Sequence, residues 1–411
     1  MKNRMRAVPS GLVLGVAACS ATGQELPKAY TLIELPGLAG STESLAWAIN
    51  NTGMVVGASE VSSGVRSAVV WDTSGAVTQL ALPPGSSDYE SIDVNDEGSV
   101  LVRAFGGSGG TYVYAFDGVV LDLPAPPGLS SVWRGNSMNA QGEVAGTGYD
   151  PIDENPVGIV WERTPGGMSP FLVGTGGSLA SFEYPHVTDS GLFVTGGTSG
   201  TGFSGTLIDR RTGSVTSGLG SSDFLPMFDV NDTRSALVIE YSGSSSIPGE
   251  PKLVSLTGPD YLLLAINCDQ PNADCGTFYI KLDLNDVVPI NPLAMNEQNW
   301  VVGVSDVVLL DSNGVAFDRE QNRAAFVWSA ESGTIDLSTL VKDGSADGWD
   351  LRSATDINED GWIVGNGIRN GESRAFLLIP REPCAGDTNR DGQVTPADFS
   401  AWVSAFNSGC D

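Results

Sequence analysis

The stretch Ala46-Trp47-Ala48-Ile49-Asn50-Asn51-Thr52-Gly53-Met54-Val55-Val56-Gly57 decides the fold. Asn50 can hydrogen-bond its own backbone two residues further on, and Gly53 tolerates the positive φ that closes a tight turn. Apolar and small residues alternate with period two on both sides of this turn, which predicts two β-strands. The stretch is therefore expected to form a β-hairpin.

The same phrase recurs along the chain, which indicates a repeat architecture. Its copies are Ser91 to Gly98, Asn136 to Gly142, His186 to Gly191, Phe228 to Asp232, Leu293 to Glu297 and Thr355 to Gly361. The first intervals are about 45 residues and later ones about 60, as insertions would produce. The copies at Asn231 and Asn296 lack the glycine, so looser turns are expected there.

A second hairpin follows each copy, so each of the seven units holds about four short antiparallel strands. Its leading strand is, for example, Arg66 to Trp71 in the first unit and Arg374 to Leu378 in the seventh. The seventh unit has three strands, and an additional strand, Tyr30 to Leu35, precedes the first unit. Pairing of that strand into the seventh unit would close a ring and remove both exposed edges. The predicted fold is an all-β, seven-bladed propeller of four-stranded blades closed by the N-terminal strand, with a small α-helical EF-hand-like tail.

The phrase Asn-x-x-Gly, followed by a strand of the form Arg-Ala-Phe, resembles the extracellular HAF-repeat proteins. The best matches are Asn322 to Phe326 and Ser373 to Leu378, and the resemblance covers roughly residues 30 to 380. It implies a secreted β-propeller-like domain, and it implies no reaction. The expected organisation is a signal peptide (1–23), the HAF-repeat propeller (24–380), a linker (381–383) and a tail (384–411).

The first residues resemble an export signal. Lys2, Arg4 and Arg6 precede the apolar stretch from Gly11 to Ala18, and Ala21-Thr22-Gly23 is a cleavage site before Gln24. The alternative is a lipoprotein box at Val16 to Cys19. Ordinary cleavage leaves an even set of cysteines, for which close spacing suggests the disulfides Cys268–Cys275 and Cys384–Cys410. The protein is therefore expected to be secreted, either extracellular or associated with the cell surface.

The tail contains a twelve-position loop with the ligand pattern of an EF-hand. Oxygen ligands for Ca²⁺ are expected from Asp387, Asn389, Asp391, the Gln393 carbonyl, Thr395 and Asp398. Gly392 allows the bend, and Thr395 caps a helix that begins at Pro396. Phe399, Trp402, Val403 and Phe406 fall on one face of that helix.

This loop and helix, framed by Cys384-Ala385-Gly386 and Gly409-Cys410, resemble the GC-type dockerin tails of secreted planctomycete proteins. A dockerin usually has two such repeats, whereas one is present here, so residues 384–411 are expected to form a truncated dockerin-like module. Positions ten and eleven are Pro396 and Ala397 instead of the usual Ser/Thr pair. The resemblance implies attachment to a surface or scaffold protein, and the departure at these two positions argues against a conventional cohesin as that partner.

Few residues suggest catalysis. The single histidine, His186, lies in a repeat turn, and Gly106-Gly107-Ser108-Gly109-Gly110 matches a nucleophile elbow without the helix that this motif needs. Trp71, Trp161 and Trp328 recur at one repeat position and are interpreted as core. Trp349 is a candidate exposed contact, and Cys268 to Cys275 bounds either a stapled hairpin tip or a recognition loop.

The formal net charge of −28 disfavours binding to nucleic acid and to anionic membranes. No segment after the leader is apolar and long enough to cross a membrane. Two functions fit these observations. The first is a non-enzymatic binding or scaffold protein whose propeller, with a glycan or protein ligand, is attached through the tail. The alternative is an extracellular polysaccharide lyase or glycosidase, since paired carboxylates can perform that chemistry and dockerin-like tails accompany such enzymes.

Overall fold

The structure is a computed structural model of the whole chain. The residues that it describes are 26–62, 64–82, 86, 88–105, 112–116, 118–128, 133–149, 156–173, 183–199, 202–210, 214–219, 224–232, 235–240, 250–255, 263–265, 290–306, 323–329, 331–381, 396, 399–400 and 403. The predicted leader, the insertion from Cys268 to Cys275 and the elbow-like stretch 106–110 lie outside this part of the chain. No helix within it is long and apolar enough to span a membrane.

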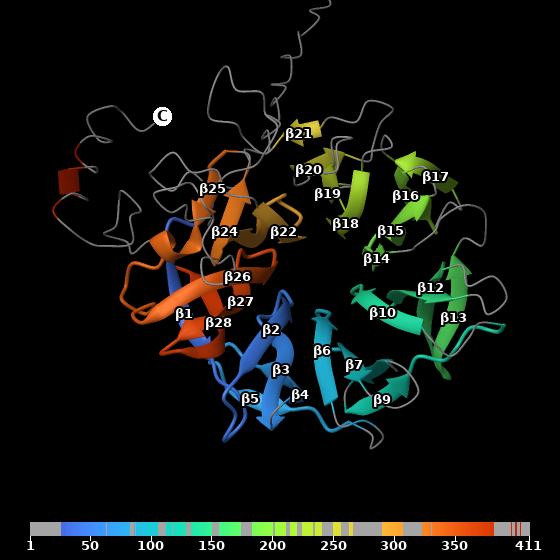
Figure 1. Cartoon of the computed structure of the whole chain (residues 1–411), viewed down its shortest axis with the longest axis horizontal. Helices are drawn as coiled ribbons and strands as arrows, with labels where there is room; N and C mark the ends of the chain where they lie inside the picture. The colour runs from blue at the N-terminus through green and yellow to red at the C-terminus, as the bar shows by residue number, and fades with distance from the viewer. Residues whose placement is uncertain are drawn as a thin grey trace, which may run out of the picture.

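The described strands form seven four-stranded antiparallel sheets arranged around a centre (Figure 1). Each sheet begins with an inner strand: β2 (Ser44–Ile49), β6 (Asp88–Val94), β10 (Trp133–Met138), β14 (Glu183–Val187), β18 (Phe224–Val230), β22 (Ile290–Met295) and β26 (Trp349–Ile357). The second strands are β3 (Val55–Ser62), β7 (Val100–Phe105), β11 (Val144–Tyr149), β15 (Leu192–Ser199), β19 (Ser235–Glu240), β23 (Val301–Asp306) and β27 (Ile363–Arg369).

The third strands are β4 (Val65–Trp71), β8 (Tyr112–Phe116), β12 (Pro156–Thr164), β16 (Gly202–Asp209), β20 (Glu250–Ser255), β24 (Arg323–Ser329) and β28 (Glu372–Pro380). The outer strands are β5 (Val77–Gln79), β9 (Val119–Asp122), β13 (Gly167–Val173), β17 (Ser214–Leu219), β21 (Leu263–Ala265), β25 (Gly333–Asp336) and β1 (Tyr30–Leu35). A short 3₁₀ helix, η1 (Leu337–Leu340), follows β25. The prediction of four strands for each repeat is confirmed.

The N-terminal strand supplies the outer strand of the last sheet. β1 pairs antiparallel with β28 along its whole length, from Tyr30 opposite Pro380 to Leu35 opposite Ala375. This pairing was predicted from the missing fourth strand of the seventh repeat, and it is confirmed. It also satisfies the backbone groups along one edge of β28, which would otherwise be free to pair with another chain.

The α-helical part of the fold-class prediction is wrong. The elements of the described chain end at β28, and none of them is an α-helix. Four tail residues, Pro396, Phe399, Ser400 and Val403, have helical backbone, but Phe399 is 68% exposed. A short helix gains most of its stability from packing its apolar face, to which a side chain as exposed as that of Phe399 contributes little. The prediction of a seven-bladed propeller with an α-helical EF-hand-like tail is therefore corrected to an all-β propeller fold.

The core lies between neighbouring sheets. The described apolar side chains form clusters between sheets, and one of them joins β1 and β26–β28 to the preceding sheet through Tyr30, Trp300 and Phe376. Trp71, Trp161 and Trp328 are each at most 2% exposed, which confirms their interpretation as core residues. The indole N–H groups of Trp71 and Trp161 donate to the carbonyls of Pro36 and Pro124, each at 2.8 Å.

The inner strands share a β-bulge three residues before the turn. In β2 the pairing with β3 skips Trp47, and equivalent skips occur in β6, β10, β18, β22 and β26. The second strand opposes the bulge with a glycine in several sheets, because a Cβ at Gly57 would lie 1.9 Å from the Leu45 carbonyl oxygen. A bulge bends its strand and re-aims the next side chains. Here it turns the residue two before the turn toward the neighbouring sheet.

Candidate binding site at the centre of the ring

The repeated turns form a hydrogen-bonded ring at one end of the inner strands. A turn asparagine accepts from the backbone N–H four residues on: Asn50 does so from Met54 at 2.8 Å, and Asn95, Asn139, Asn296 and Asn358 do so in their own turns. Its Nδ2 donates to the backbone carbonyl of the next turn: Asn50 to Asn95, Asn95 to Asn139, Asn139 to Thr188, Asn231 to Asn296, Asn296 to Asn358 and Asn358 to Asn50. The turn residues are at most 6% exposed. Because buried amides must be paired, these side chains hold neighbouring sheets together.

The sequence predicted the role of these residues within their own turns. It did not predict their hydrogen bonds to the neighbouring sheet. Asn50 and Asn358 bond the N–H two residues on, as predicted. Gly53 and Gly361 have the predicted positive φ, 82° and 74°. The looser turn expected at Asn296 is not found, since Asn299 takes the glycine position with φ 62° and its N–H donates to the Asn296 carbonyl at 3.0 Å. The inter-sheet bonds could have been suspected only from the recurrence of Asn itself, because aspartate would serve the turn equally well.

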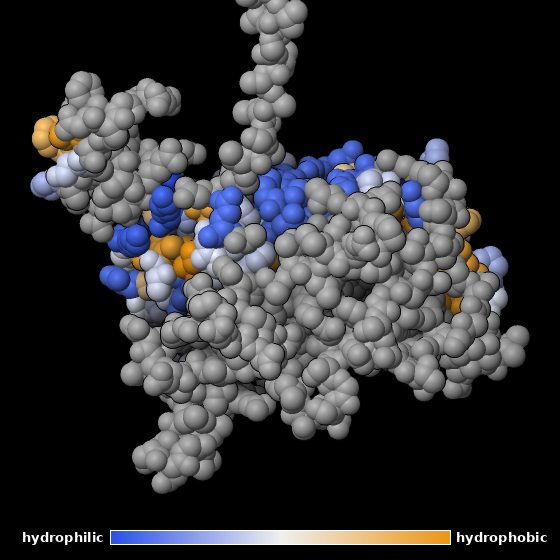
Figure 2. All heavy atoms as spheres, turned by 90° about the horizontal axis from the view of Figure 1, so that it is seen from above, coloured by the Kyte–Doolittle hydropathy of each residue, from blue (hydrophilic) through white to orange (hydrophobic). Residues whose placement is uncertain are grey.

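A ring of carboxylates surrounds these asparagines. Backbone N–H groups of one turn donate to an acidic side chain of the next, as Ala140 does to Asp189 at 2.6 Å and Asp232 to Glu297 at 2.8 Å. We call Asp96, Asp189, Asp232, Glu297 and Glu359 the acidic annulus. Figure 2, which views the molecule edge-on, shows described hydrophilic residues gathered along one of its faces.

The annulus borders a shallow cavity at the mouth of the ring. The cavity has a volume of about 160 Å³, and Asp96, Asp189 and Glu359 line it together with turn asparagines. Burial raises the pKa of Asp189, and the nearby Asp232 and Asp96 carboxylates raise it further. Burial likewise raises the pKa of Glu359, with repulsion from Glu297 and Asp96. The mouth is therefore a concave, polar surface of negative potential.

Below the mouth lies a second ring, which we call the channel layer. It consists of the residue two before each turn residue: Ala48, Asp93, Ser137, His186, Asp229, Ala294 and Asp356. Each aspartate accepts two backbone N–H groups, one from its own strand and one from the next inner strand. Asp93 bonds Val94 at 2.7 Å and Met138 at 2.6 Å. Asp229 and Asp356 repeat this pattern with Val230 and Met295, and with Ile357 and Ile49.

Two of the aspartates follow a repeat that has alanine, and so no side-chain acceptor, at this position. Asp93 follows Ala48 and Asp356 follows Ala294, and each accepts the N–H of its own next residue. Where the preceding repeat has Ser137, its hydroxyl accepts from the Val187 N–H at 3.1 Å. The side-chain acceptors of the channel layer therefore link successive sheets. These acceptors lie far apart in the sequence and meet only because the ring is closed.

The three channel carboxyls hold protons unusually tightly. Burial raises the pKa of Asp93 to about 6 and that of Asp229 to about 7, although the side chain of Asp229 is still 21% exposed. Burial also raises the pKa of Asp356 well above its ordinary value, and the charges of Asp229 and Asp93 add to this. The N–H groups that they accept act in the opposite direction and lower the pKa.

The structure places His186 in this layer, with Nδ1 3.7 Å from Oδ1 of Asp229. Ser137, His186 and Asp229 thus follow one another on three inner strands, which is a set of side chains that nucleophilic catalysis uses. The Ser137 hydroxyl, however, donates to the Pro185 carbonyl at 3.4 Å and accepts from Val187. Both oxygens of Asp229 accept backbone N–H groups. The described contacts of these two side chains are therefore structural.

Other sequence-predicted residues are separate from this centre. Trp349 is not an isolated surface contact. Its ring packs edge-on against that of Phe376, with the ring centroids 6.1 Å apart, and the guanidinium carbon of Arg369 lies 5.6 Å from the Trp349 ring centroid. The predicted Ca²⁺ ligands Asp387, Asn389, Asp391, Gln393, Thr395 and Asp398 lie outside the described residues. The four cysteines Cys268, Cys275, Cys384 and Cys410 also lie outside them.

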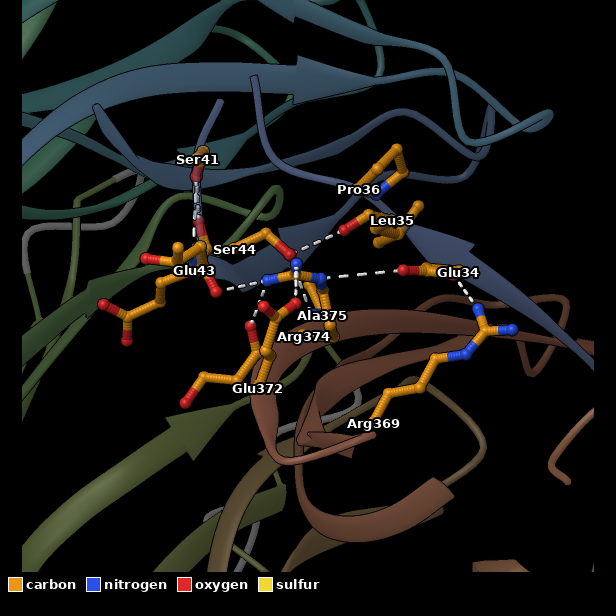
Figure 3. Close-up of polar contacts among 12 residues, drawn as sticks. Glu34, Leu35, Pro36, Ser41, Glu43, Ser44, Arg369, Glu372, Arg374 and Ala375 are labelled. Carbon is orange, nitrogen blue, oxygen red and sulfur yellow. Dashed lines mark hydrogen bonds and ion pairs between the residues drawn. The ribbon is translucent and has the colours of Figure 1, made fainter. Parts of the chain in front are cut away.

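The arginine of the Arg-Ala-Phe phrase secures the closure of the ring (Figure 3). Arg374 on β28 donates to the Thr42 carbonyl and forms ion pairs with Glu372 and, at 3.6 Å, with Glu34 of β1. In the same place the Ala375 N–H donates to Ser44, whose hydroxyl donates to the Leu35 carbonyl at 2.7 Å. Arg66, one register position earlier on β4, forms an ion pair with Glu90 of the next sheet at 2.6 Å. In these two repeats an arginine of the third strand therefore contacts the next sheet or the segment that leads to it.

Comparison with known proteins gives the fold alone. No protein-family model matches the chain, and no curated protein matches it either. Among solved structures, the β-propeller domain of the Trilobed protease from Pyrococcus furiosus matches with a TM-score of 0.50 and 9% identity, over 83% of this chain and 95% of that one. An oligogalacturonate lyase in complex with manganese matches with a TM-score of 0.50 and 10% identity, over 88% of this chain and 98% of the lyase chain.

A third structure, YCF48 bound to D1 peptide, has a TM-score of 0.48 and 12% identity, over 87% of this chain and 98% of the YCF48 chain. The protease domain has an open velcro topology, whereas here β1 pairs with β28. The likeness to the protease domain and to the lyase, at 9% and 10% identity, supports a shared β-propeller fold and does not extend to activity.

Proposed function

We propose that this protein is a secreted or cell-surface binding or scaffold protein of the HAF-repeat type. In this proposal the propeller is a rigid platform that presents a glycan or protein ligand site at the mouth of the ring, and the tail attaches it to a surface partner through Ca²⁺. One observation carries the platform role. The turn asparagines and channel aspartates are bonded to backbone groups of neighbouring sheets, so they stiffen the ring around a concave acidic mouth.

The charge of the mouth indicates the kind of ligand. The annulus carboxylates come from successive turns, so the negative potential is spread around the mouth. A ligand that docks there must bring hydrogen-bond donors or positive charge, because like charges would repel it. Hydroxyl-rich glycans and basic segments of proteins meet this requirement.

The platform role is tested by a binding and turnover screen with the mature protein. Soluble and immobilised polysaccharides, together with surface extracts of the producing cell, are assayed for retention of the protein and for new reducing or unsaturated ends. We expect saturable binding without turnover, and weaker binding when Asp189 and Glu359 are replaced by Asn and Gln. Turnover that one carboxylate substitution abolishes would contradict the proposal and favour a lyase or glycosidase.

The attachment role requires Ca²⁺ in the tail. Six oxygen ligands in the EF-hand order suit this hard cation. Calorimetric titration of the full mature chain with CaCl₂ is expected to show one site, which Asp387→Ala removes. Asp350→Ala, an exposed carboxylate of the propeller that pairs with Arg352, is the control and should leave the titration unchanged. No heat of binding, or equal binding by Asp387→Ala, would refute the Ca²⁺ site.

A further inference from the structure

A second cavity, with a volume of about 330 Å³, lies between the sheets of β2–β5 and β6–β9, which are neighbours around the ring (Figure 1). None of its lining residues borders the cavity at the mouth. The lining comes from β4, β5, the segment that follows β5, and β6, and it includes Ser67, Ala68, Gln79, Leu80, Leu82 and Tyr89. This volume lies within the range of ligand pockets, which begins at about 300 Å³.

The apolar part of this lining is held in place by the core. Leu80, Leu82 and Tyr89 pack against the buried cluster that contains Ala68. The Leu80 N–H donates to the Ala68 carbonyl at 3.0 Å, so the segment after β5 continues the pairing of that strand. The Tyr89 hydroxyl accepts from the Ser86 N–H at 3.2 Å, which fixes the orientation of the ring. The apolar surface is therefore formed before a ligand binds, which lowers the entropic cost of binding.

The rest of the lining is polar and uncharged. The Gln79 amide nitrogen donates to the Ser67 hydroxyl oxygen at 3.0 Å, which orients the amide at the cavity. Gln79 is exposed, and within the described part of the chain its amide oxygen and second N–H have no other partner. An amide and a hydroxyl both donate and accept hydrogen bonds. The cavity therefore offers donors and acceptors next to an apolar surface.

The absence of charge distinguishes this cavity from the surface around it. The strand register places acidic residues, Asp122, Asp336 and Glu34, at the position of Gln79 in three other sheets. In a chain with a net charge of −28, the lining of this cavity has no charged side chain among its described residues. A charged ligand would gain no ion pair from the lining, and the field of the protein would repel an anionic one. The cavity therefore favours a neutral ligand.

We propose that this cavity binds one pyranose ring of a neutral glycan. A pyranose ring has a face of C–H groups, which suits the apolar surface made by Leu82 and Tyr89. Its hydroxyls donate and accept at once, as the Gln79 amide and the Ser67 hydroxyl also do. The site goes beyond the proposed function, which places a ligand at the acidic mouth, and it does not depend on that function.

The test titrates the full mature chain with cellotetraose, maltotetraose and mannotetraose as neutral probes, and with trigalacturonic acid as a charged one. Calorimetry and ligand-observed NMR are expected to show saturable binding of at least one neutral probe and no binding of trigalacturonic acid. Gln79→Ala should weaken that binding about three- to tenfold through the lost hydrogen bonds, and Ala81→Phe, which places a ring in the opening, should abolish it. Both positions are exposed, so the fold should be retained. The control Thr78→Ala, at the adjacent exposed position of β5, should bind as the wild type does.

Three results would overturn the proposal. The first is no binding of any neutral probe, and the second is equal binding by the wild type, Gln79→Ala and Ala81→Phe. The third is binding of trigalacturonic acid as tight as that of the neutral probes. If binding is lost in the mouth variant Asp189→Asn, Glu359→Gln but kept in Gln79→Ala, the glycan belongs to the mouth. That result refutes the cavity site and leaves the proposed function in place.

Discussion

At the scale of single residues, the turn asparagines perform two functions that one side chain rarely combines. The amide oxygen closes the turn of its own repeat, and the amide nitrogen bonds the next repeat. Aspartate can replace the first function but not the second, because it has no donor when ionised. In the fourth repeat Thr188 takes this place, and its hydroxyl contacts Ser190 at 2.9 Å and accepts from the Leu192 N–H.

Asn358 offers the sharpest test of this dual function, because its Nδ2 donates to the Asn50 carbonyl where the last repeat meets the first. Asn358→Ala leaves the Trp362 N–H and the Asn50 carbonyl without these partners in a site that is 4% exposed. We expect a loss of about 2–4 kcal/mol in the free energy of unfolding, measured by chemical denaturation. Asn51→Ala, in the adjacent exposed position, should cost less than about 1 kcal/mol. Equal costs for the two variants would contradict the role of the buried ring.

The sequence revealed these residues only in part. The Asn-x-x-Gly pattern predicts a turn from local chemistry, and the turns at Asn50 and Asn358 form as predicted. It does not predict that Asp93, Asp229 and Asp356 face one channel, since their positions are 136 and 127 residues apart (229 − 93 and 356 − 229). In a strand they appear as ordinary polar members of an alternating pattern. Only the bulge before each turn and the closure of the ring bring them together.

At the scale of elements, β1 closes the ring by pairing with the last repeat. β1 completes the sheet of β26–β28, and Tyr30 and Leu35 are fully buried. The segment after η1 covers its outer side, because Ser345 accepts from the Leu32 N–H at 2.8 Å. Asp343 in the same segment accepts from the Thr31 hydroxyl at 2.7 Å. The strand is thus held on both sides, which prevents it from acting as an open edge.

Arg374 tests the polar contacts of this closure. Its side chain is 13% exposed and touches Glu34, Glu372 and the Thr42 carbonyl. Arg374→Ala removes the guanidinium from these acceptors, of which Glu34 keeps its ion pair with Arg369, so we expect the free energy of unfolding to fall by about 1–3 kcal/mol. The matched control is Arg352→Ala, whose ion pair with Asp350 is more exposed and should contribute less than about 0.5 kcal/mol. Thermal and urea unfolding that rank the two variants in reverse would refute this role.

At the scale of the whole molecule, the net charge of −28 acts against compactness. Carboxylates crowd the mouth and the channel, and their mutual repulsion is strongest when few counterions are present. The hydrogen bonds between sheets and the apolar clusters must exceed this repulsion for the ring to remain closed.

Salt should therefore stabilise the protein. Raising NaCl from about 0.01 M to about 0.15 M at pH 8 shortens the screening length from about 30 Å to about 8 Å, and we expect the thermal midpoint to rise by about 2–5 °C. The increase should be smaller at pH 5, where the channel carboxyls bind protons. Calorimetry in the presence of a chelator separates this effect from Ca²⁺ binding. A midpoint that falls with added salt would show that attractive ion pairs, such as that of Arg374, outweigh the repulsion.

The sequence by itself determined the β-hairpin repeat, the four strands of each unit and the pairing of the first strand with the last unit, because alternation, turn chemistry and an unpaired strand edge are local or countable features. It predicted an α-helical tail from a local motif, whereas the elements of the described chain end at β28 and include no α-helix. A local motif does not supply the tertiary contacts from which a short helix gains most of its stability. The tertiary structure alone decided which polar residues meet. Hydrogen bonds between sheets, the acidic annulus and the channel layer arise from ring closure, which places side chains from distant repeats within 3 Å of one another's backbones.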